Sequence, residues 1–480
     1  MNILILGAGQ VGMATAASLA SEGTNITVVD IDPERLRLLQ DRFDLATVEG
    51  NASHPSILTR AGAGDADIVL AVTRTDQVNL VACKLAATLF GVPTKIARIR
   101  AGDYLSHPDI FNKENFSVDL AICPEQIVTE YISRLIKYPE SLQVMDFAGG
   151  LAQLVGVCAV DGGPLVHHEL QELGIHMPRI DARVAAIFRG GRALAPDGHT
   201  VIEPGDEVFF IAARQNIRAV MCELHQQDKP VRRIMIAGGG NIGARLAKAQ
   251  EQHHEVKLIE LRKSGAKSLA EELKHTLVLA GDATDEALLE MESVEAIDMF
   301  CAVTNDDEAN IMAALLAKRM GARRVLALVN RGAYANLVQG GPIDIAVSPA
   351  QVTIGMLLAR VRHGDVAVCH SLRHGAAEAL EMVAHGDANT SKIIGRRVDE
   401  VALPSEATIA ALVRWQGDEG NRAAGNSDGK IIIAHHDTVI ESGDHVIVFV
   451  TNKRVMSRIE KLFQVSVPAR NIITKALRQH

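Results

Sequence analysis

Short aliphatic runs alternate with glycine-rich or polar stretches along most of the chain. The first run, Met1–Leu6, is rich in branched apolar residues and predicts a buried strand. Met13–Ser21 then carries Ala and Leu at helical spacing, which predicts a helix. Further strand-length runs lie at Asn25–Val29, Leu45–Gly50, Ile68–Val72 and Lys95–Ile99. Buried aliphatic strands of this kind predict parallel sheets that are covered by helices.

Two interleaved internal repeats divide the chain in the order A–B–A–B. The segment ILILGAGQVG (3–12) recurs as IMIAGGGNIG (234–243), and AVTRTDQVNLVACKL (71–85) recurs as AVTNDDEANIMAALL (302–316). A second repeat matches TVIEPGDEVFFIA (200–212) with TVIESGDHVIVFV (438–450). We therefore predict four modules followed by a tail. Their boundaries are 1–139 (A), 140–228 (B), 231–363 (A), 364–453 (B) and 454–480 (tail).

The loop between the first predicted strand and helix has glycine spacing typical of dinucleotide binding. In this strand–loop–helix context, the spacing predicts a Rossmann-like, doubly wound parallel sheet. The first glycine permits the tight turn, the second lets the backbone approach a pyrophosphate, and the third lets the helix pack on the strand. The helix N-terminus offers free N–H groups to phosphates. The loop residues are Gly7, Ala8, Gly9, Gln10, Val11 and Gly12.

Polar residues at the ends of later strands extend this predicted site. The second strand ends in Asp30, where an acidic side chain holds ribose hydroxyls and disfavours a 2′-phosphate, so NAD is expected rather than NADP. Ligands of doubly wound sheets bind at the carboxyl ends of the strands. Guanidinium groups there are suited to phosphates. The further candidates are Asn51 and Ala52 near an adenine, and Thr73, Arg74 and Arg98.

The second A module keeps the phosphate loop and the acidic residue but loses the cations. Glu260 stands in for Asp30, Asn305 replaces Arg74, and we align Ala327 with Arg98. We therefore expect the second site to bind nucleotides differently, and multiply charged ones more weakly. The candidate residues of this site are Gly238, Gly239, Gly240, Asn241, Ile242, Gly243, Glu260, Asp282, Ala283, Thr304 and Asn305.

Composition and charge exclude several classes of protein. The net charge of −9 and the aromatic content of 3% argue against a nucleic-acid partner. Apolar runs such as Val208–Ala213 and Val446–Val450 have the length of strands and not of membrane spans. The six cysteines form no CxxC pair, and the histidines have no partners at metal-ligand spacing. We expect a cytoplasmic protein with reduced thiols and no metal site.

Residues for catalysis are missing from the repeated modules. A dehydrogenase carries a proton donor or acceptor in a substrate domain, but an A module has room only for a mononucleotide fold and a terminal helix. The B modules share the turns Glu203–Asp206 and Glu441–Asp444, to which we assign a structural role. The sequence thus predicts a nucleotide sensor that is not an enzyme. An NAD-dependent oxidoreductase with an unrecognised substrate and a structural scaffold are the alternatives.

The duplicated arrangement resembles tandem RCK domains, the regulators of potassium conductance. The resemblance covers about residues 1–453 and rests on MNILILGAGQVG, VEGNAS (48–53), AVTRTDQVN (71–79) and the second loop, GGGNIG. It implies that each A module is a nucleotide-binding RCK N-terminal domain and each B module a small α+β RCK C-terminal domain. It also implies that Pro124–Lys137 and Pro349–His363 are terminal helices that pair neighbouring units.

The same resemblance carries expectations about function. RCK proteins bind NAD(H), and ATP or ADP as alternative ligands, to control a membrane potassium transporter. The expected protein is therefore a peripheral cytoplasmic subunit on the inner face of the membrane. Its expected partner is a Trk-type transporter subunit, and its expected homo-oligomer is a tetramer. The sequence does not assign a role to the tail.

Overall fold

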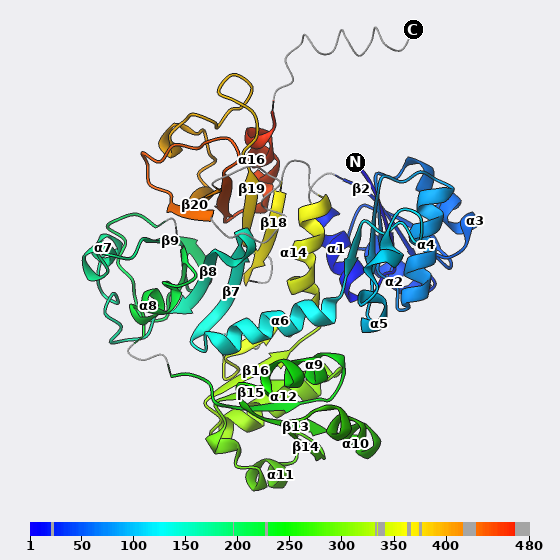
Figure 1. The fold of residues 1–480 in the computed structure, drawn as a ribbon, viewed down its shortest axis with the longest axis horizontal. Coiled ribbons are helices and arrows are strands. Elements are labelled where there is room, and N and C mark those ends of the chain that lie inside the picture. The colour runs from blue at the N-terminus through cyan, green and yellow to red at the C-terminus, as the bar shows by residue number, and fades with distance from the viewer. Residues whose placement is uncertain are drawn as a thin grey trace. The chain divides into compact units, whose positions relative to one another are not determined.

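The computed structural model shows four sheets, which are distributed over two compact units (Figure 1). One unit comprises Met1–Ser133 and Arg232–Val361, and the other comprises Arg134–Val231 and the chain from residue 362 onward. This division into two units does not test the four module boundaries that we predict from the sequence, so these boundaries remain a proposal. The structure describes residues 1–20, 24–194, 196–225, 229–331, 334, 341–361, 366–373, 377–415 and 429–465.

The first large module is a six-stranded parallel sheet in the order β3-β2-β1-β4-β5-β6. Its strands are β1 (Asn2–Leu6), β2 (Asn25–Asp30), β3 (Ala46–Glu49), β4 (Ile68–Ala71), β5 (Thr94–Arg98) and β6 (Leu120–Ile122). Its helices are α1 (Gln10–Ala20), α2 (Pro33–Gln40), α3 (Pro55–Arg60), α4 (Asp76–Thr88), α5 (Gly102–Leu105) and α6 (Pro124–Lys137).

The second large module repeats this sheet in the order β14-β13-β12-β15-β16-β17. Its strands are β12 (Arg233–Ala237), β13 (Glu255–Glu260), β14 (Thr276–Ala280), β15 (Met299–Ala302), β16 (Arg324–Leu328) and β17 (Ile345–Val347). Its helices are α9 (Asn241–Gln250), α10 (Lys263–Glu272), α11 (Glu286–Met291), α12 (Asp307–Arg319) and α14 (Pro349–Val361). The 3-2-1-4-5-6 order is that of a complete dinucleotide-binding fold, which is larger than the mononucleotide fold that we expected.

The terminal helices α6 and α14 connect the two large modules. Helix α14 packs against α1 of the first module. From α6, the Ser133 hydroxyl accepts a hydrogen bond from the Gln250 amide of α9 over 2.9 Å. Each large module is therefore in contact with the terminal helix of the other, which agrees with the pairing that the RCK resemblance implies. Residues 362 and 363 of the expected second helix lie outside the described residues.

The two small modules are antiparallel sheets with the same strand order. The first contains β7 (Ser141–Phe147), β8 (Ala152–Cys158), β9 (Ala182–Arg189), β10 (Arg192–Leu194) and β11 (Glu207–Ala213), with α7 (Leu173–His176) and α8 (Ile217–Cys222). The second contains β18 (Val366–Leu372), β19 (Ala377–Val383), β20 (Ala407–Trp415), β21 (Gly429–Ile433) and β22 (His445–Val450), with α16 (Met456–Phe463). The orders are β10-β9-β11-β8-β7 and β21-β20-β22-β19-β18. This confirms the predicted fold class.

Both small sheets contribute to one hydrophobic core. Phe147 and Phe209 of the first sheet and Phe449 of the second are fully or almost fully buried in the same cluster. Four of the eleven Phe side chains of the chain, Phe188 included, thus lie in this otherwise aliphatic core. Helix α16 buries Met456 and Phe463, so the predicted tail begins with a packed helix. Residues 466–480 of the tail lie outside the described residues.

Candidate functional site

The glycine loop connects β1 to α1 and has the backbone geometry that the sequence predicts. Gly7 has a φ of +114°, a conformation that favours glycine. A Cβ on Gly12 would lie 1.9 Å from the Gly7 carbonyl oxygen, whereas a Cβ on Gly9 would meet nothing within 4 Å. Gly12 therefore serves helix packing, and Gly9 leaves open space where a phosphate can approach the backbone.

The second loop, between β12 and α9, has the same geometry. Gly238 has a φ of +108°, and a Cβ on Gly243 would lie 1.8 Å from the Gly238 carbonyl oxygen. A Cβ on Gly240 would meet nothing within 4 Å. The first turn of each helix leaves its N–H groups without intrahelical partners. Both loops therefore fit an anionic phosphate group. Gln10 and Asn241 are exposed at the starts of these helices, while Val11 is buried and Ile242 half-buried.

The acidic residues that end β2 and β13 are tied to these loops. The Ala8 N–H donates to Asp30 Oδ2 over 2.5 Å, and the Gly239 N–H donates to Glu260 Oε2 over 2.9 Å. Burial alone would raise the pKa of Glu260, but hydrogen bonds from the N–H groups of Arg262 and Gly239 lower it below its ordinary value. The lowered pKa favours the charged form of this carboxylate, whose oxygens accept hydrogen bonds.

The residues after β3 and β14 form matching turns. Asn51 Oδ1 accepts from the Ser53 N–H over 3.0 Å, and Asp282 Oδ1 accepts from the Thr284 N–H over 2.8 Å. Ala52 is buried, and Ala283 is half-buried. These turns lie at the same sheet edge as the loops, because β3 and β14 are parallel to the strands that end at the acidic residues.

A threonine–asparagine pair joins the ends of two further strands in each copy. The Thr73 hydroxyl donates to Asn79 Oδ1 over 2.7 Å, and the Asn79 amide donates to the Arg98 carbonyl over 2.8 Å. Thr304 and Asn310 make the same two bonds, the second of them to Leu328. The backbone of Thr73 lies so close to Gly7 that a Cβ on Gly7 would be only 2.9 Å from the Thr73 nitrogen. The threonine–asparagine pair is therefore in contact with the glycine loop.

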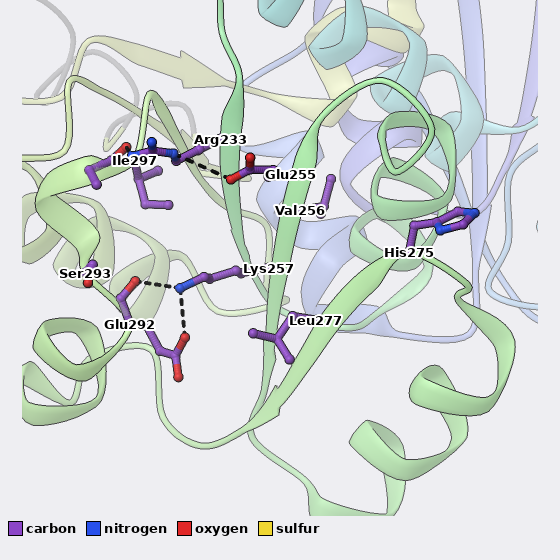
Figure 2. A pocket seen from close by; sticks show the side chains of 10 residues that line it. Arg233, Glu255, Val256, Lys257, His275, Leu277, Glu292, Ser293 and Ile297 are labelled. Atoms are coloured by element: carbon purple, nitrogen blue, oxygen red, sulfur yellow. Dashed lines mark hydrogen bonds and ion pairs between the residues drawn. The ribbon is translucent and has the colours of Figure 1, made fainter.

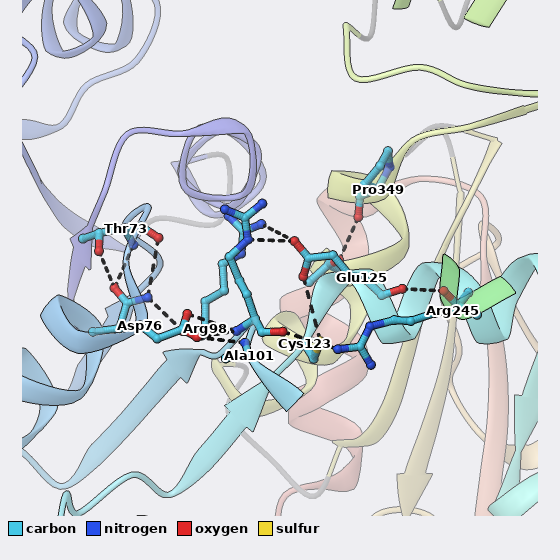
Figure 3. Close-up of polar contacts among 12 residues, drawn as sticks. Thr73, Asp76, Arg98, Ala101, Cys123, Glu125, Arg245 and Pro349 are labelled. Carbon is cyan, nitrogen blue, oxygen red and sulfur yellow. Dashed lines mark hydrogen bonds and ion pairs between the residues drawn. The ribbon is translucent and has the colours of Figure 1, made fainter. Parts of the chain in front are cut away.

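Arg98 is paired with a carboxylate that the sequence analysis did not find. Its Nη2 donates to Glu125 Oε1 over 3.0 Å, and Arg100 Nε donates to the same oxygen over 2.9 Å (Figure 3). Burial would raise the pKa of Glu125, but the charge of Arg98, with further help from Arg100, lowers it. Arg74 is exposed, as is its counterpart Asn305.

The strand register corrects the alignment of Arg98 with the second copy. Ala71 pairs with Ala97 and Ala302 pairs with Ala327, so the counterpart of Arg98 is Leu328 and not Ala327. The turn after α12 is one residue shorter than the turn after α4, so the offset between the two copies falls from 231 to 230 across this turn. The inference that this position lacks a cation in the second copy stands.

A cavity of about 370 Å³ lies elsewhere in the second large module (Figure 2). It opens at the amino ends of β12, β13 and β14, whereas the glycine loop follows the carboxyl end of β12. Its cations are already paired, since Lys257 Nζ lies 2.9 Å from Glu292 and Arg233 Nε lies 3.5 Å from Glu255. This cavity is therefore separate from the nucleotide site.

Comparison with known proteins identifies the family. TrkA-N domain sequences match residues 3–124 and 234–349, and TrkA-C domain sequences match residues 155–224. The Trk system potassium uptake protein TrkA of Halomonas elongata is 54% identical over 467 residues, which cover 97% of this chain and 99% of that protein. The chain belongs to the TrkA family. The Vibrio alginolyticus TrkA is 53% identical over the same shares of both chains.

Solved structures agree with TrkA membership at the level of the fold. The GsuK RCK domain superposes with a TM-score of 0.60 at 18% identity and covers 96% of this chain and 94% of its own. The GsuK channel bound to NAD also gives 0.60, at 17% identity, with coverages of 96% and 78%. The TrkA relatives from Halomonas elongata, Vibrio alginolyticus and Haemophilus influenzae are named as potassium uptake proteins, and none of these names denotes an enzyme. None of the helices in the described ranges is both long and apolar enough to span a bilayer.

Several residues that shape the TrkA sites escaped the sequence analysis, although a signal existed for some. Asp76 accepts from the Arg100 N–H over 3.0 Å, and Asp307 accepts from the Asn330 N–H over 2.9 Å. These aspartates, like Asn79 and Asn310, are identical between the repeated segments. Their identity in both copies was therefore a signal in the sequence that these four residues shape the site. Glu125 has no acidic counterpart, so the repeat gave no such signal.

Proposed function

We propose that this chain is the cytoplasmic nucleotide-sensing subunit of a Trk-type potassium uptake system. Both glycine loops would bind NAD(H), and ATP or ADP would be alternative ligands. The main support is that the chain has two six-stranded sheets with the strand order of dinucleotide-binding folds. Each sheet has an open glycine loop and an acidic residue that is hydrogen-bonded to this loop. The chain also belongs to a family of potassium uptake proteins. The GsuK channel, a protein of the same fold, has a structure with bound NAD, which supports this choice of ligand.

The proposed partner is a membrane potassium transporter subunit, with this chain on the inner face of the membrane as a tetramer. A ligand shifts a conformational equilibrium only by its differential affinity for the two states. Coupling energies are typically about 1–3 kcal/mol per site, so several sites in one assembly are sufficient to change the state of a transporter. The proposed candidate ligand residues are those of the two loops and strand ends named above.

Titration with NADH, followed by fluorescence, tests this function against the oxidoreductase alternative. We expect saturable binding to the full chain without oxidation of NADH when candidate substrates are added. Steady turnover of the nicotinamide would contradict the regulatory function, and a complete lack of nucleotide binding would favour a structural scaffold.

Replacing Asp30 by alanine is expected to weaken NADH binding at the first site about tenfold, since a charge-assisted hydrogen bond to the ribose is lost. The measurement is the same titration in a chain that also carries Glu260→Ala, so that the signal reports the first site. Asp41→Ala removes an exposed carboxylate at the end of α2 and serves as the matched control. Equal affinities of the Asp30 and Asp41 variants would refute the assignment of Asp30.

A further inference from the structure

An ion triad of Arg98, Glu125 and Arg100 is built into the first large module only. Arg98 is the last residue of β5, and Glu125 is the second residue of α6. The Glu125 side chain is 8% exposed and accepts from both guanidinium groups with one oxygen. In the second copy, the corresponding positions after β16 and in α14 are Leu328, Asn330 and Ala350, which carry no charge.

The backbone of Arg98 is linked to the predicted phosphate loop by a short series of contacts. The chain of contacts runs from Gly7 to Thr73, from Thr73 to Asn79, and from Asn79 to the backbone of Arg98. Arginine binds carboxylates and phosphates with the same fork of donors. Glu125 therefore occupies the cations that a nucleotide phosphate at this loop would attract.

One hydrogen-bond donor of the Arg98 side chain has no acceptor among the residues that the structure describes. Its Nε is buried and has no hydrogen-bond partner within the described part of the chain. A buried donor without a partner is costly. The guanidinium thus has an unused donor, which an additional anionic oxygen is able to satisfy.

The triad also connects the first site to the second large module. Arg245 of α9, which lies near Cys123 in Figure 3, donates to the Arg100 carbonyl over 3.4 Å. Gln250 of α9 donates to Ser133 of α6 over 2.9 Å. Glu125 lies in the first turn of α6, the helix whose Ser133 makes the second of these contacts. A change in the pairing of Glu125 is therefore able to reach the neighbouring module through α6.

We propose that Glu125 is a latch, which competes with the terminal phosphates of a nucleoside di- or triphosphate for Arg98 and Arg100. Binding of such a ligand at the first site displaces Glu125 and releases the first turn of α6. A ligand with more phosphate charge displaces the carboxylate more effectively, so the latch distinguishes ADP and ATP from NAD. The second site has no latch. This inference rests on the proposed binding of nucleotides at the first loop.

Replacing Glu125 by glutamine tests the latch by removing the competing charge at nearly constant shape. Isothermal titration of the full chain with ADP is expected to show about fivefold or tighter binding in Glu125→Gln, and a smaller change with NAD. The control is Glu308→Gln in the second large module, where the exposed Glu308 carboxylate lies 2.7 Å from Arg331 Nη1. This substitution also removes one negative charge, and it should leave the ADP affinity of the first site unchanged.

Unchanged or weaker ADP binding in Glu125→Gln would overturn the latch, because Glu125 would then be neutral toward the ligand or would assist it. Failure of the unaltered chain to bind ADP at all would instead overturn the proposed ligands of the first site. The two failures are therefore distinguishable.

Hydrogen exchange on the unaltered chain tests the latch without any substitution. ADP is expected to protect residues 7–12 and to increase amide exchange in the first turn of α6, near residues 124–130, whereas NAD protects the loop alone. Protection of the loop by ADP without faster exchange in α6 would contradict release of the helix.

Discussion

Replacing Asp206 by alanine is expected to lower the free energy of opening of the first small sheet by about 3 kcal/mol. The Asp206 side chain is 1% exposed and accepts from Arg189 Nε over 2.8 Å and from Arg189 Nη2 over 2.7 Å. It also accepts from the Glu203 N–H over 2.9 Å, which closes the turn before β11. Alanine removes the acceptor of these three hydrogen bonds, and Arg189 keeps Glu203 and the Val201 carbonyl as partners. Native-state hydrogen exchange of β9 and β11 measures the loss.

The second small sheet offers a matched replicate of this substitution. Asp444 is buried and accepts hydrogen bonds from Arg414 Nε and Arg414 Nη2, each over 2.8 Å. It also accepts from the Glu441 N–H over 2.8 Å. Asp444→Ala should therefore cost about as much in β20 and β22. The control is Asp161→Ala, which removes an exposed carboxylate of the first small module. A loss below about 1 kcal/mol in either sheet would contradict the structural role assigned to these turns.

Replacing Gly12 by alanine is expected to cost about 3 kcal/mol and to abolish nucleotide binding at the first site. The new Cβ would lie 1.9 Å from the Gly7 carbonyl oxygen, so the backbone of the loop and of α1 must move apart. Thermal unfolding and NADH titration measure the two effects. The structure predicts the same for Gly243→Ala, whose Cβ would lie 1.8 Å from Gly238.

Gly9→Ala is the informative control for this prediction. A Cβ at Gly9 meets no protein atom within 4 Å, so stability should be kept, while the methyl group stands where a phosphate approaches the backbone. We expect NADH affinity at the first site to fall at least about tenfold. Retained affinity in Gly9→Ala, together with lost affinity in Gly12→Ala, would mean that the loop is a packing element and not a ligand site.

Much of the fold follows from local sequence signals. The aliphatic runs are long enough to specify β1, β2 and β4, and glycine spacing at Gly7, Gly9 and Gly12 specifies the turn between strand and helix. The internal repeat then transfers both assignments to the second copy without further argument. These signals suffice because each depends on neighbours within about one strand and one helix.

The remaining features depend on long-range contacts, which leave little trace in a single sequence. The strands β6 and β17 have three residues each, which is too short for a hydrophobic period to be visible. Arg98 could be placed at a strand end, but its pairing with Glu125 joins residues 27 positions apart through the fold. The misalignment with Ala327 has the same origin, because the pairing of neighbouring strands is needed to fix Leu328 as the counterpart of Arg98.

Potassium flux through the assembled transport system tests the central claim most directly. The full chain would be purified together with its transporter, reconstituted in vesicles, and assayed with ADP, ATP and NADH, beside a variant that carries Gly9→Ala and Gly240→Ala. At concentrations that just saturate the unaltered chain, we expect these nucleotides to change the flux with that chain and to have a much smaller effect with the variant, whose fold should be intact. A nucleotide response of equal size in both chains would contradict the claim that the two glycine loops sense nucleotides for potassium transport.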